Sequence, residues 1–222
     1  MKRSLIIGSN GTIGSALQKL MLADNELYTI SQSDTDYCDD SLALLSSKLK
    51  EKGDFHTIIC CIGVLHNDVV APEKSLTQIK RDVLAEYFRI NTILPAMCLK
   101  AFAPLLSKRE PSRFTFLSAM VGSIEDNALG GWYGYRSSKA ALNMMVKTAS
   151  IELARTNKQA MIAAIHPGTT QGPLSKPFAA GINRDKYYTP EQSAKRILQI
   201  TESLQAVDTG SFYNWDGREL PW

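Results

Sequence analysis

Tyr135 and Lys139 are the residues of this sequence whose types and spacing most directly suggest chemistry. Residues four apart in a helix lie on one face, with Cβ atoms about 5–6 Å apart. A nearby ammonium group favours the phenolate and so lowers the pKa of a tyrosine. Such a phenol can donate a proton to a carbonyl oxygen or accept one from an alcohol. The same spacing is common on ordinary surface helices, so the pair needs independent support.

A glycine-rich segment near the N-terminus supplies that support. It follows the apolar segment Leu5–Ile7 and opens Thr12–Ala23, where apolar residues recur at helical spacing. Glycines at a strand–helix junction allow a tight turn and close backbone approach to a pyrophosphate, which the helix N-terminus also favours. The residues expected to form this dinucleotide-binding loop are Gly8, Ser9, Asn10, Gly11, Thr12, Ile13 and Gly14.

The elements that must position these residues alternate between strand and helix. Apolar segments of strand length predict parallel strands covered on both faces. Pro95 and Pro104 predict kinks or breaks in one long helix, and Thr189 before Pro190 predicts a helix start. The expected strands are Leu5–Ile7, Leu27–Ile30, Thr57–Ile62, Arg113–Ser118, Ala160–His166 and Ser211–Asn214, with Thr35–Tyr37 a candidate for another. The expected helices are Thr12–Ala23, Asp39 or Asp40 (as cap) to about Lys50, Ile79–Leu106, Tyr133–Arg155 and one from Pro190.

This alternation predicts an α/β fold, a Rossmann-type doubly wound parallel sheet with helices on both faces. The 222 residues suit a single domain, 1–222. Hydrophobic residues make up 44% and charged residues 21%, typical of a globular chain. The net charge of +3 argues against nucleic acid or an anionic membrane as partner.

The cysteines indicate free thiols and no metal site. Cys60 and Cys61 are adjacent in an apolar segment, and Cys38 and Cys98 complete no zinc spacing. Free thiols fit a reducing compartment. The N-terminus has too few apolar residues for a signal peptide, and no segment approaches the ~20 that span a membrane. The sequence therefore predicts a cytoplasmic protein without a membrane partner.

Four features, in order and spacing, resemble the short-chain dehydrogenase/reductase family: the glycine loop, Asn91, Tyr135-x-x-x-Lys139 and Pro167-Gly168. The resemblance covers nearly the whole chain. Within the family the chain is similar to the small, atypical branch of C-factor-like and sniffer-like carbonyl reductases. The residues that suggest this branch are Gly130–Tyr133, His166–Thr169, Leu174–Phe178, Trp215–Gly217 and Pro221-Trp222.

The resemblance implies a role for each matching residue. Tyr135 would exchange the proton, while Lys139 would lower its pKa and bind the nicotinamide ribose. The backbone of Asn91 would hold a water in a proton relay to that lysine. The residues expected to contact the cofactor beyond the glycine loop are Ser31, Asp36, Cys61, Gly63, Tyr135, Lys139, Pro167, Gly168 and Thr169.

The chain departs from the family pattern in four places. Its glycines are spaced G-x-x-G-x-x-G instead of G-x-x-x-G-x-G, and Cys60–Gly63 replaces Asn-Asn-Ala-Gly. Gly172 stands where a threonine often contacts the carboxamide. The most serious departure is Ala119, at the position of the usual active-site serine. Ser118 or Ser123 could supply the hydroxyl, with a slight preference for Ser118; loss of one donor to an oxyanion lowers rates roughly 10²–10³-fold elsewhere.

Cofactor preference depends on the residues after the second strand. An acidic residue there would accept the ribose 2′-hydroxyl and favour NAD(H). The neutral Ser31-Gln32-Ser33 favours NADP(H), although Asp34 follows one step later and keeps NAD(H) open. Asp36 resembles the short acidic turn at the adenine ring, and a plain turn role fits it almost equally well.

The remaining expectations concern the substrate side. Trp132 and Tyr133 could line a pocket or merely pack at a helix start, and His166 has a structural role in preference to a chemical one. Residues 173–188 are expected to form a short lid. The resemblance also implies a homodimer or homotetramer.

The leading hypothesis is an NADP(H)-dependent oxidoreductase acting on a small-molecule carbonyl or secondary alcohol. The alternative is a non-enzymatic nucleotide-binding protein with a signalling or regulatory role, favoured by Ala119, the Cys60–Gly63 loop and Gly172. A sugar-nucleotide epimerase has the right glycine spacing, but the chain is too short for its substrate domain.

Overall fold

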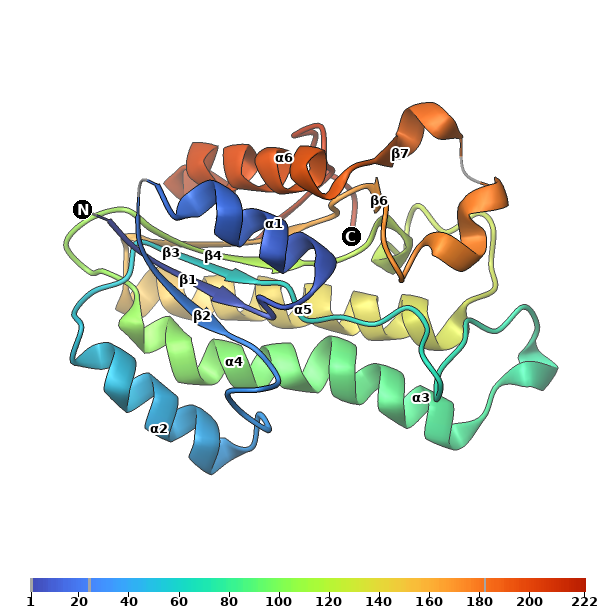
Figure 1. Cartoon of the computed structure of the whole chain (residues 1–222), viewed down its shortest axis with the longest axis horizontal. Helices are drawn as coiled ribbons and strands as arrows, with labels where there is room; N and C mark the ends of the chain where they lie inside the picture. Colours follow the sequence, from blue (N-terminus) through green and yellow to red (C-terminus); the bar gives the residue numbers. More distant parts are fainter. Residues whose placement is uncertain (1, 24, 182) are drawn as a thin grey trace.

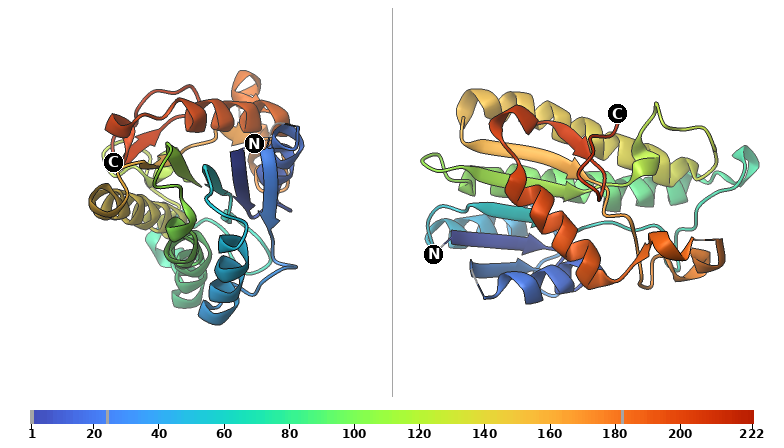
Figure 2. Two further views of the ribbon diagram at one scale, coloured as in Figure 1. Left: turned by 90° about the vertical axis from the view of Figure 1, so that its left-hand side faces the viewer. Right: turned by 90° about the horizontal axis from the view of Figure 1, so that it is seen from above.

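Six parallel strands form the central sheet of the computed structural model, which describes residues 2–23, 25–181 and 183–222 (Figures 1 and 2). Their order is β2-β1-β3-β4-β5-β8, and every neighbouring pair is parallel. The strands are β1 (Lys2–Ile7), β2 (Asn25–Ile30), β3 (Thr57–Cys60), β4 (Ser112–Leu117), β5 (Ala160–Ile165) and β8 (Ser211–Tyr213); β6 (Thr169–Thr170) and β7 (Tyr187–Tyr188) form a separate pair.

Helices cover both faces of the sheet. In Figure 1, α1 and α6 lie above it, while α2, α4 and α5 lie below it. The helices are α1 (Thr12–Met21), α2 (Asp39–Lys50), α3 (Arg81–Phe88), α4 (Leu94–Phe102), α5 (Tyr133–Thr156) and α6 (Pro190–Ser203). The chain runs outward from β1 to β2 on one side and from β3 to β8 on the other. This arrangement confirms the predicted doubly wound α/β fold.

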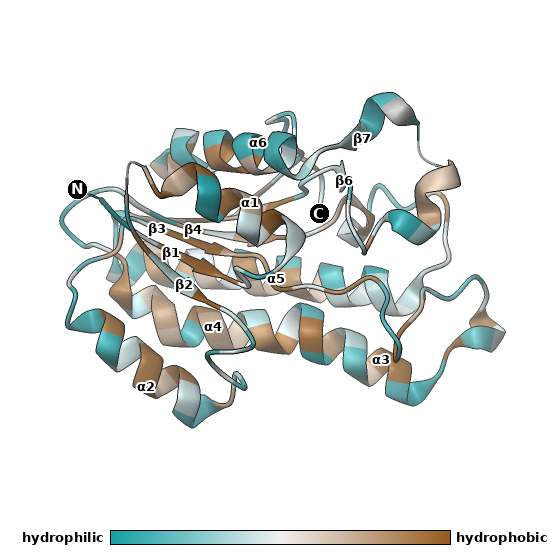
Figure 3. Ribbon diagram, in the orientation of Figure 1, coloured by the Kyte–Doolittle hydropathy of each residue, from teal (hydrophilic) through white to brown (hydrophobic). Residues whose placement is uncertain are grey.

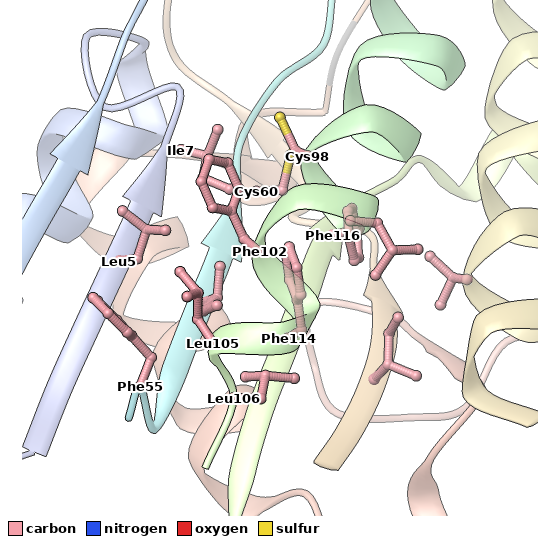
Figure 4. Close-up of a cluster of buried hydrophobic side chains, with 14 of the residues drawn as sticks. Leu5, Ile7, Phe55, Cys60, Cys98, Phe102, Leu105, Leu106, Phe114 and Phe116 are labelled. Carbon is pink, nitrogen blue, oxygen red and sulfur yellow. The ribbon is translucent and has the colours of Figure 1, made fainter. Parts of the chain in front are cut away.

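Apolar side chains fill the space on both sides of the sheet, which is why the strands are brown in Figure 3. The larger core, shown in Figure 4, joins strand residues such as Phe114 and Phe116 to Phe102 of the helical layer, and all three are 0–1% exposed. A second core includes Ile59 and lies against α1 and α6. Each fully buried phenylalanine contributes about 1.5–3 kcal/mol to the free energy of unfolding.

Two predicted elements differ from the structure. Thr35–Tyr37 is irregular loop, in which Thr35 Oγ1 accepts from Tyr37 N and Tyr37 has φ +60°, so it cannot continue a strand. The cap of α2 is Cys38, whose Sγ accepts from Ser41 N, and neither of the predicted aspartates. All four cysteines are free, as expected; Cys38 is exposed and Cys61 only partly buried.

The predicted helix Ile79–Leu106 is divided. A π-helical turn, Arg89–Ile93, separates α3 from α4, and Pro95 lies in the first turn of α4. Proline lacks an N–H group and is tolerated at that place, so the preceding turn absorbs the break. Pro104 falls in a terminal 3₁₀ turn. The start of α6 is confirmed, because Thr189 and Gln192 form a capping box before its first turn.

Candidate active site

A cavity of about 410 Å³ opens at the carboxyl ends of β1, β3, β4 and β5. In doubly wound sheets this is the edge at which ligands bind, and the volume suits a small molecule. The glycine loop, the loops after β3 and β4, the start of α5 and the segment after β5 contribute to its walls. The cavity therefore brings together segments that are far apart in the sequence.

The backbone of the glycine loop is packed too closely for a Cβ atom at two of its glycines. Gly8 has φ +81°, and a Cβ on it would lie 3.2 Å from Cys61 C and Ile62 N. A Cβ on Gly14 would collide with the Gly8 carbonyl oxygen. No side chain caps α1 at Gly11, so the N–H groups of its first turn remain available. Backbone donors at a helix N-terminus with no blocking side chain fit a dinucleotide pyrophosphate.

Replacement of Gly14 by alanine is expected to disrupt this loop. The added methyl group meets backbone atoms that cannot move independently, and overpacking of this kind costs about 1–3 kcal/mol of unfolding free energy. We expect the affinity for a nicotinamide dinucleotide to fall at least tenfold, measured by fluorescence titration with parallel thermal unfolding. Gly181→Ala is the control, because a Cβ there meets no atom of the described, non-neighbouring residues within 4 Å. Wild-type affinity and stability in G14A would contradict the expectation.

The Tyr135 hydroxyl lines the cavity and forms no hydrogen bond with any described residue. Its ring contacts Tyr87 and Trp132, with centroids 6.1 and 6.2 Å away. Burial raises the pKa of Tyr135 above its ordinary value. The lowered pKa expected from the sequence is therefore not found, because burial disfavours the charged phenolate. The phenol is protonated at neutral pH, the state in which it can donate a proton.

Lys139 is buried beneath the loops after β3 and β4. Its Nζ donates to Leu117 O at 2.9 Å, and burial lowers its pKa to about 8. A Cβ on Gly63 would lie 3.0 Å from this Nζ, and one on Gly122 would lie 2.8 Å from Lys139 Cβ. Both glycines thus make room for the lysine, which gives Gly63 a role that the sequence did not suggest.

The side chain of Asn91 ties the loop after β3 to α5. Its Oδ1 accepts from Val64 N at 2.7 Å, and its Nδ2 donates to Val64 O and Ser138 Oγ. Asn91 is fully buried in the π-helical turn, so its amide is satisfied by the protein. A relay through its backbone stays a prediction.

Of the two serines considered as replacements for the one missing at Ala119, only Ser118 lines the cavity. It lines the cavity beside Ala119, while Ser123 does not and instead accepts from Asp126 N. The Ser118 hydroxyl donates to Asn143 Oδ1 at 2.6 Å. Asn143 was missed by the sequence reasoning, although it follows Lys139 by four residues and therefore continues the face that carries Tyr135.

The other predicted cofactor contacts divide into two groups. Those at the cavity are Gly11, Thr12, Ile13, Gly14, Cys61, Gly63, Pro167, Gly168 and Thr169. Ser9 is turned away, with its hydroxyl donating to Ile30 O, and Asn10 is exposed.

Ser31 and Asp36 lie outside the cavity, beyond the end of β2. The Ser31 hydroxyl and N–H both donate to Asp34 Oδ2 at 2.7 Å. Asp36 accepts from Cys38 N just before α2. The contact of Asp36 with the backbone is the plain turn role that the sequence left open.

The outer wall of the cavity is aromatic and apolar. Phe178 contacts Trp132 and His66, with ring centroids 5.3 and 5.8 Å away, and the His66 ring lies 2.9 Å from Pro173 O. Leu174, Ser175 and Phe178 from residues 173–188 line the cavity, and a lid role of this segment stays a prediction. Residue 182 lies outside the described residues. His166 also lines the cavity, and burial lowers its pKa to about 4, so it is neutral.

Across residues 2–23, 25–181 and 183–222, no group of three or more His, Cys, Asp and Glu side chains could hold a metal ion. No described helix combines the length and apolar composition required to cross a membrane.

Comparison with known proteins identifies the family. A short-chain dehydrogenase profile described as "Enoyl-(Acyl carrier protein) reductase" matches residues 18–207. The chain therefore belongs to the short-chain dehydrogenase/reductase family, a family of NAD(P)-dependent oxidoreductases.

Its relatives include a dehydrogenase and a protein named C-signal. The chain is 30% identical over 184 residues to 1-hydroxy-2-glutathionyl-2-methyl-3-butene dehydrogenase of Rhodococcus sp. (strain AD45), covering 82% of this chain and 76% of the relative. It is 30% identical over 139 residues to C-signal of Myxococcus xanthus, covering 63% and 78%. The chain is also 31% identical over 151 residues to an oxidoreductase of Schizosaccharomyces pombe. This match covers 64% of this chain and 59% of that protein.

Two solved structures share the fold. NADPH-bound carbonyl reductase from chicken fatty liver superimposes with a TM-score of 0.83, at 21% identity, over 100% of this chain and 99% of that one. Carbonyl reductase Sniffer of D. melanogaster gives 0.82, at 22% identity, over 100% of both chains. Together with C-signal, these likenesses agree with the predicted branch of the family.

Proposed function

We propose that the protein reduces an uncharged carbonyl compound, or oxidises the corresponding secondary alcohol, with Tyr135 exchanging the proton. The observation that carries this proposal is the unpaired, protonated Tyr135 hydroxyl in a cavity that begins at an uncapped helix N-terminus. One end of the cavity suits a dinucleotide and the other offers a proton donor.

Each residue of the site has a distinct task. A nicotinamide dinucleotide, when bound, supplies the hydride. The glycine loop would hold its pyrophosphate, and Lys139, four residues after Tyr135 in α5, would provide a positive charge. Ser118, in place of the serine missing at Ala119, offers a second hydroxyl, which must first leave Asn143. Such positioned donors stabilise the developing charge on the substrate oxygen.

The walls of the cavity define the kind of substrate. Leu65, Met120, Val121, Trp132 and Phe178 line it, and none of its described lining residues is Lys, Arg, Asp or Glu. Among these apolar side chains a charged group of the substrate would be desolvated without an oppositely charged side chain to pair with. This favours an uncharged ketone or aldehyde with an alkyl or aryl group.

For the cofactor we propose NADP(H), with NAD(H) as the alternative. Support for NADP(H) comes from the Ser31 and Ser33 hydroxyls, 2.7 Å apart after β2, and from the NADPH-bound chicken enzyme. The alternative rests on Asp34, whose carboxylate accepts from Ser31 and would repel a 2′-phosphate.

Further proposals concern the organisation of the protein. We propose that residues 1–222 form one domain with a lid at 173–188, in a cytoplasmic homodimer or homotetramer. Exposed apolar side chains on α5, Met144 and Ile151, support an interface on that helix.

The test is turnover with a panel of uncharged ketones and aldehydes, following NADPH and NADH absorbance. We expect the protein to oxidise NADPH in the presence of at least one of these compounds, and to bind NADPH with a lower Kd than NADH. Binding of either dinucleotide without turnover of any compound would instead favour the signalling or regulatory alternative, to which the similarity to C-signal lends support. A lower Kd for NADH would overturn the cofactor preference alone.

A further inference from the structure

The start of α5 lacks the features that normally stabilise a helix N-terminus. Three successive residues before the helix have positive φ: Gly130 (+64°), Gly131 (+65°) and Trp132 (+54°). Trp132 occupies the N-cap position and forms no side-chain capping hydrogen bond. The first turn also contains no acidic residue. A helix of 24 residues nevertheless has unpaired N–H groups and a positive dipole end there. Tyr135 is in this first turn.

A carboxylate from a distant segment takes the place of the missing cap. Glu73, in the loop between β3 and α3, accepts from Gly134 N with Oε2 at 3.1 Å, and its main-chain oxygen accepts from Trp132 N. It is only 3% exposed. Two hydrogen bonds thus join this loop to both sides of the first residue of α5.

The packing around Gly134 leaves no room for a side chain. A Cβ on Gly134 would lie 2.9 Å from Glu73 Oε1 and 2.5 Å from the Tyr87 ring. Tyr87 in turn donates to Leu65 O and packs against Tyr135. Glu73, Tyr87 and the first turn of α5 therefore form one rigid unit around the proposed proton donor.

The burial of Glu73 is difficult to explain by packing alone. It forms no ion pair within the described residues, and its Oε1 is buried without a hydrogen-bond partner. Burial of a carboxylate is unfavourable unless another interaction offsets its desolvation. Here the N-terminus of α5, with its free N–H groups and positive dipole end, provides that interaction.

We infer that Glu73 is a positioning residue: its carboxylate caps α5 and thereby sets where the Tyr135 hydroxyl lies in the cavity. This inference rests on the proposed role of Tyr135. A displacement of about 1 Å at a reacting group can lower the rate about 10²-fold, so the cap matters for turnover as well as for stability.

The experiment compares Glu73→Ala, which removes the acceptor, with Glu73→Gln, which keeps an acceptor but loses the charge. We expect E73A to lower kcat about 10–100-fold at unchanged NADPH Kd and carbonyl KM, and E73Q to recover most of the loss. Amide hydrogen exchange of residues 130–140, without cofactor, should rise at least tenfold in E73A and much less in E73Q. Glu191→Ala, at the start of α6, is the control and should leave all of these quantities unchanged, because Thr189 already caps that helix.

Hydrogen exchange tests the cap, and turnover tests the proposed function. If wild type turns over no carbonyl compound, the proposed function fails, while exchange still tests the cap. Wild-type exchange and turnover in E73A would overturn the inference. Equal damage in E73Q and E73A, with NADPH binding lost as well, would also overturn it, since Glu73 would then support the fold in general. If E73A does not fold, E73Q decides: turnover and exchange near wild type support the inference.

Discussion

Replacement of Tyr135 by phenylalanine is expected to lower kcat for carbonyl reduction by about 10²–10⁴-fold, the usual contribution of a positioned general acid. The affinity for NADPH should stay within about twofold, because the ring and its contacts with Tyr87 and Trp132 remain. The structure adds an expectation about stability. The hydroxyl has no partner among the described residues, so its removal should leave Tm unchanged or raise it.

The matched control is Tyr133→Phe. Tyr133 begins the same helix, yet it does not line the cavity. Steady-state kinetics, NADPH fluorescence titration and thermal unfolding should be measured on both variants. A Y135F protein with wild-type kcat would remove Tyr135 from the reaction, and a comparable loss in Y133F would show that the effect is not specific.

Replacement of Lys139 by methionine is expected to abolish turnover and to stabilise the fold at neutral pH. Burial lowers the lysine pKa from an ordinary value of 10.5 to about 8, so the native protein holds this charge at a disadvantage. A difference of one pKa unit corresponds to about 1.36 kcal/mol. The variant also leaves the Leu117 carbonyl without its donor, which offsets part of the gain. We therefore expect the free energy of unfolding to increase by on the order of 1–3 kcal/mol.

This gain should depend on pH in one direction. Between pH 8 and 10.5 the unfolded chain keeps the Lys139 proton while the native protein loses it. The unfolding free energy contributed by this group in wild type therefore rises with pH across that window. The advantage of K139M should be full at pH 7 and largely gone near pH 10.

Denaturant unfolding of cofactor-free protein at pH 7 and pH 10 measures this dependence. Lys147→Met is the control, because Lys147 also donates to a backbone carbonyl, that of Gly210, but is exposed on the same helix. A K139M variant less stable than wild type at both pH values would show that burial of the charge is not the dominant effect.

The fold was largely predictable because it depends on patterns that are local in the sequence. Apolar segments such as Thr57–Ile62 and the capping signal Thr189-Pro190 report on nearby residues only. The strand ends and the first turn of α6 accordingly match the structure within a few residues. The π-helical turn at Asn91 was not predictable, because its position depends on contacts with Val64 and Ser138 that are distant in sequence.

The candidate site was predictable in its residues but less so in its energetics. Tyr135, singled out by its spacing from Lys139, lines the cavity, whereas the position of Gly63 beside Lys139 was not predicted. The pKa of Tyr135 was predicted in the wrong direction, because depth of burial cannot be read from spacing. The partnership of Ser118 with Asn143 was missed for a related reason: hydrogen bonds between a strand and a helix depend on the packed structure.

The π-helical turn at Arg89–Ile93 also changes which way the surrounding helix faces. Each residue of an α-helix advances the side-chain direction by about 100°, and a π turn accommodates one residue more than an α turn. On one side of the turn Tyr87 meets Glu73 and Tyr135, while on the other Cys98 and Phe102 enter the core of the sheet (Figure 4). Deletion of one residue here would regularise the helix and yet rotate one half by about 100° against the other. The residues before the deletion could then no longer contact Glu73 and Tyr135 while the residues after it pack in the core of the sheet.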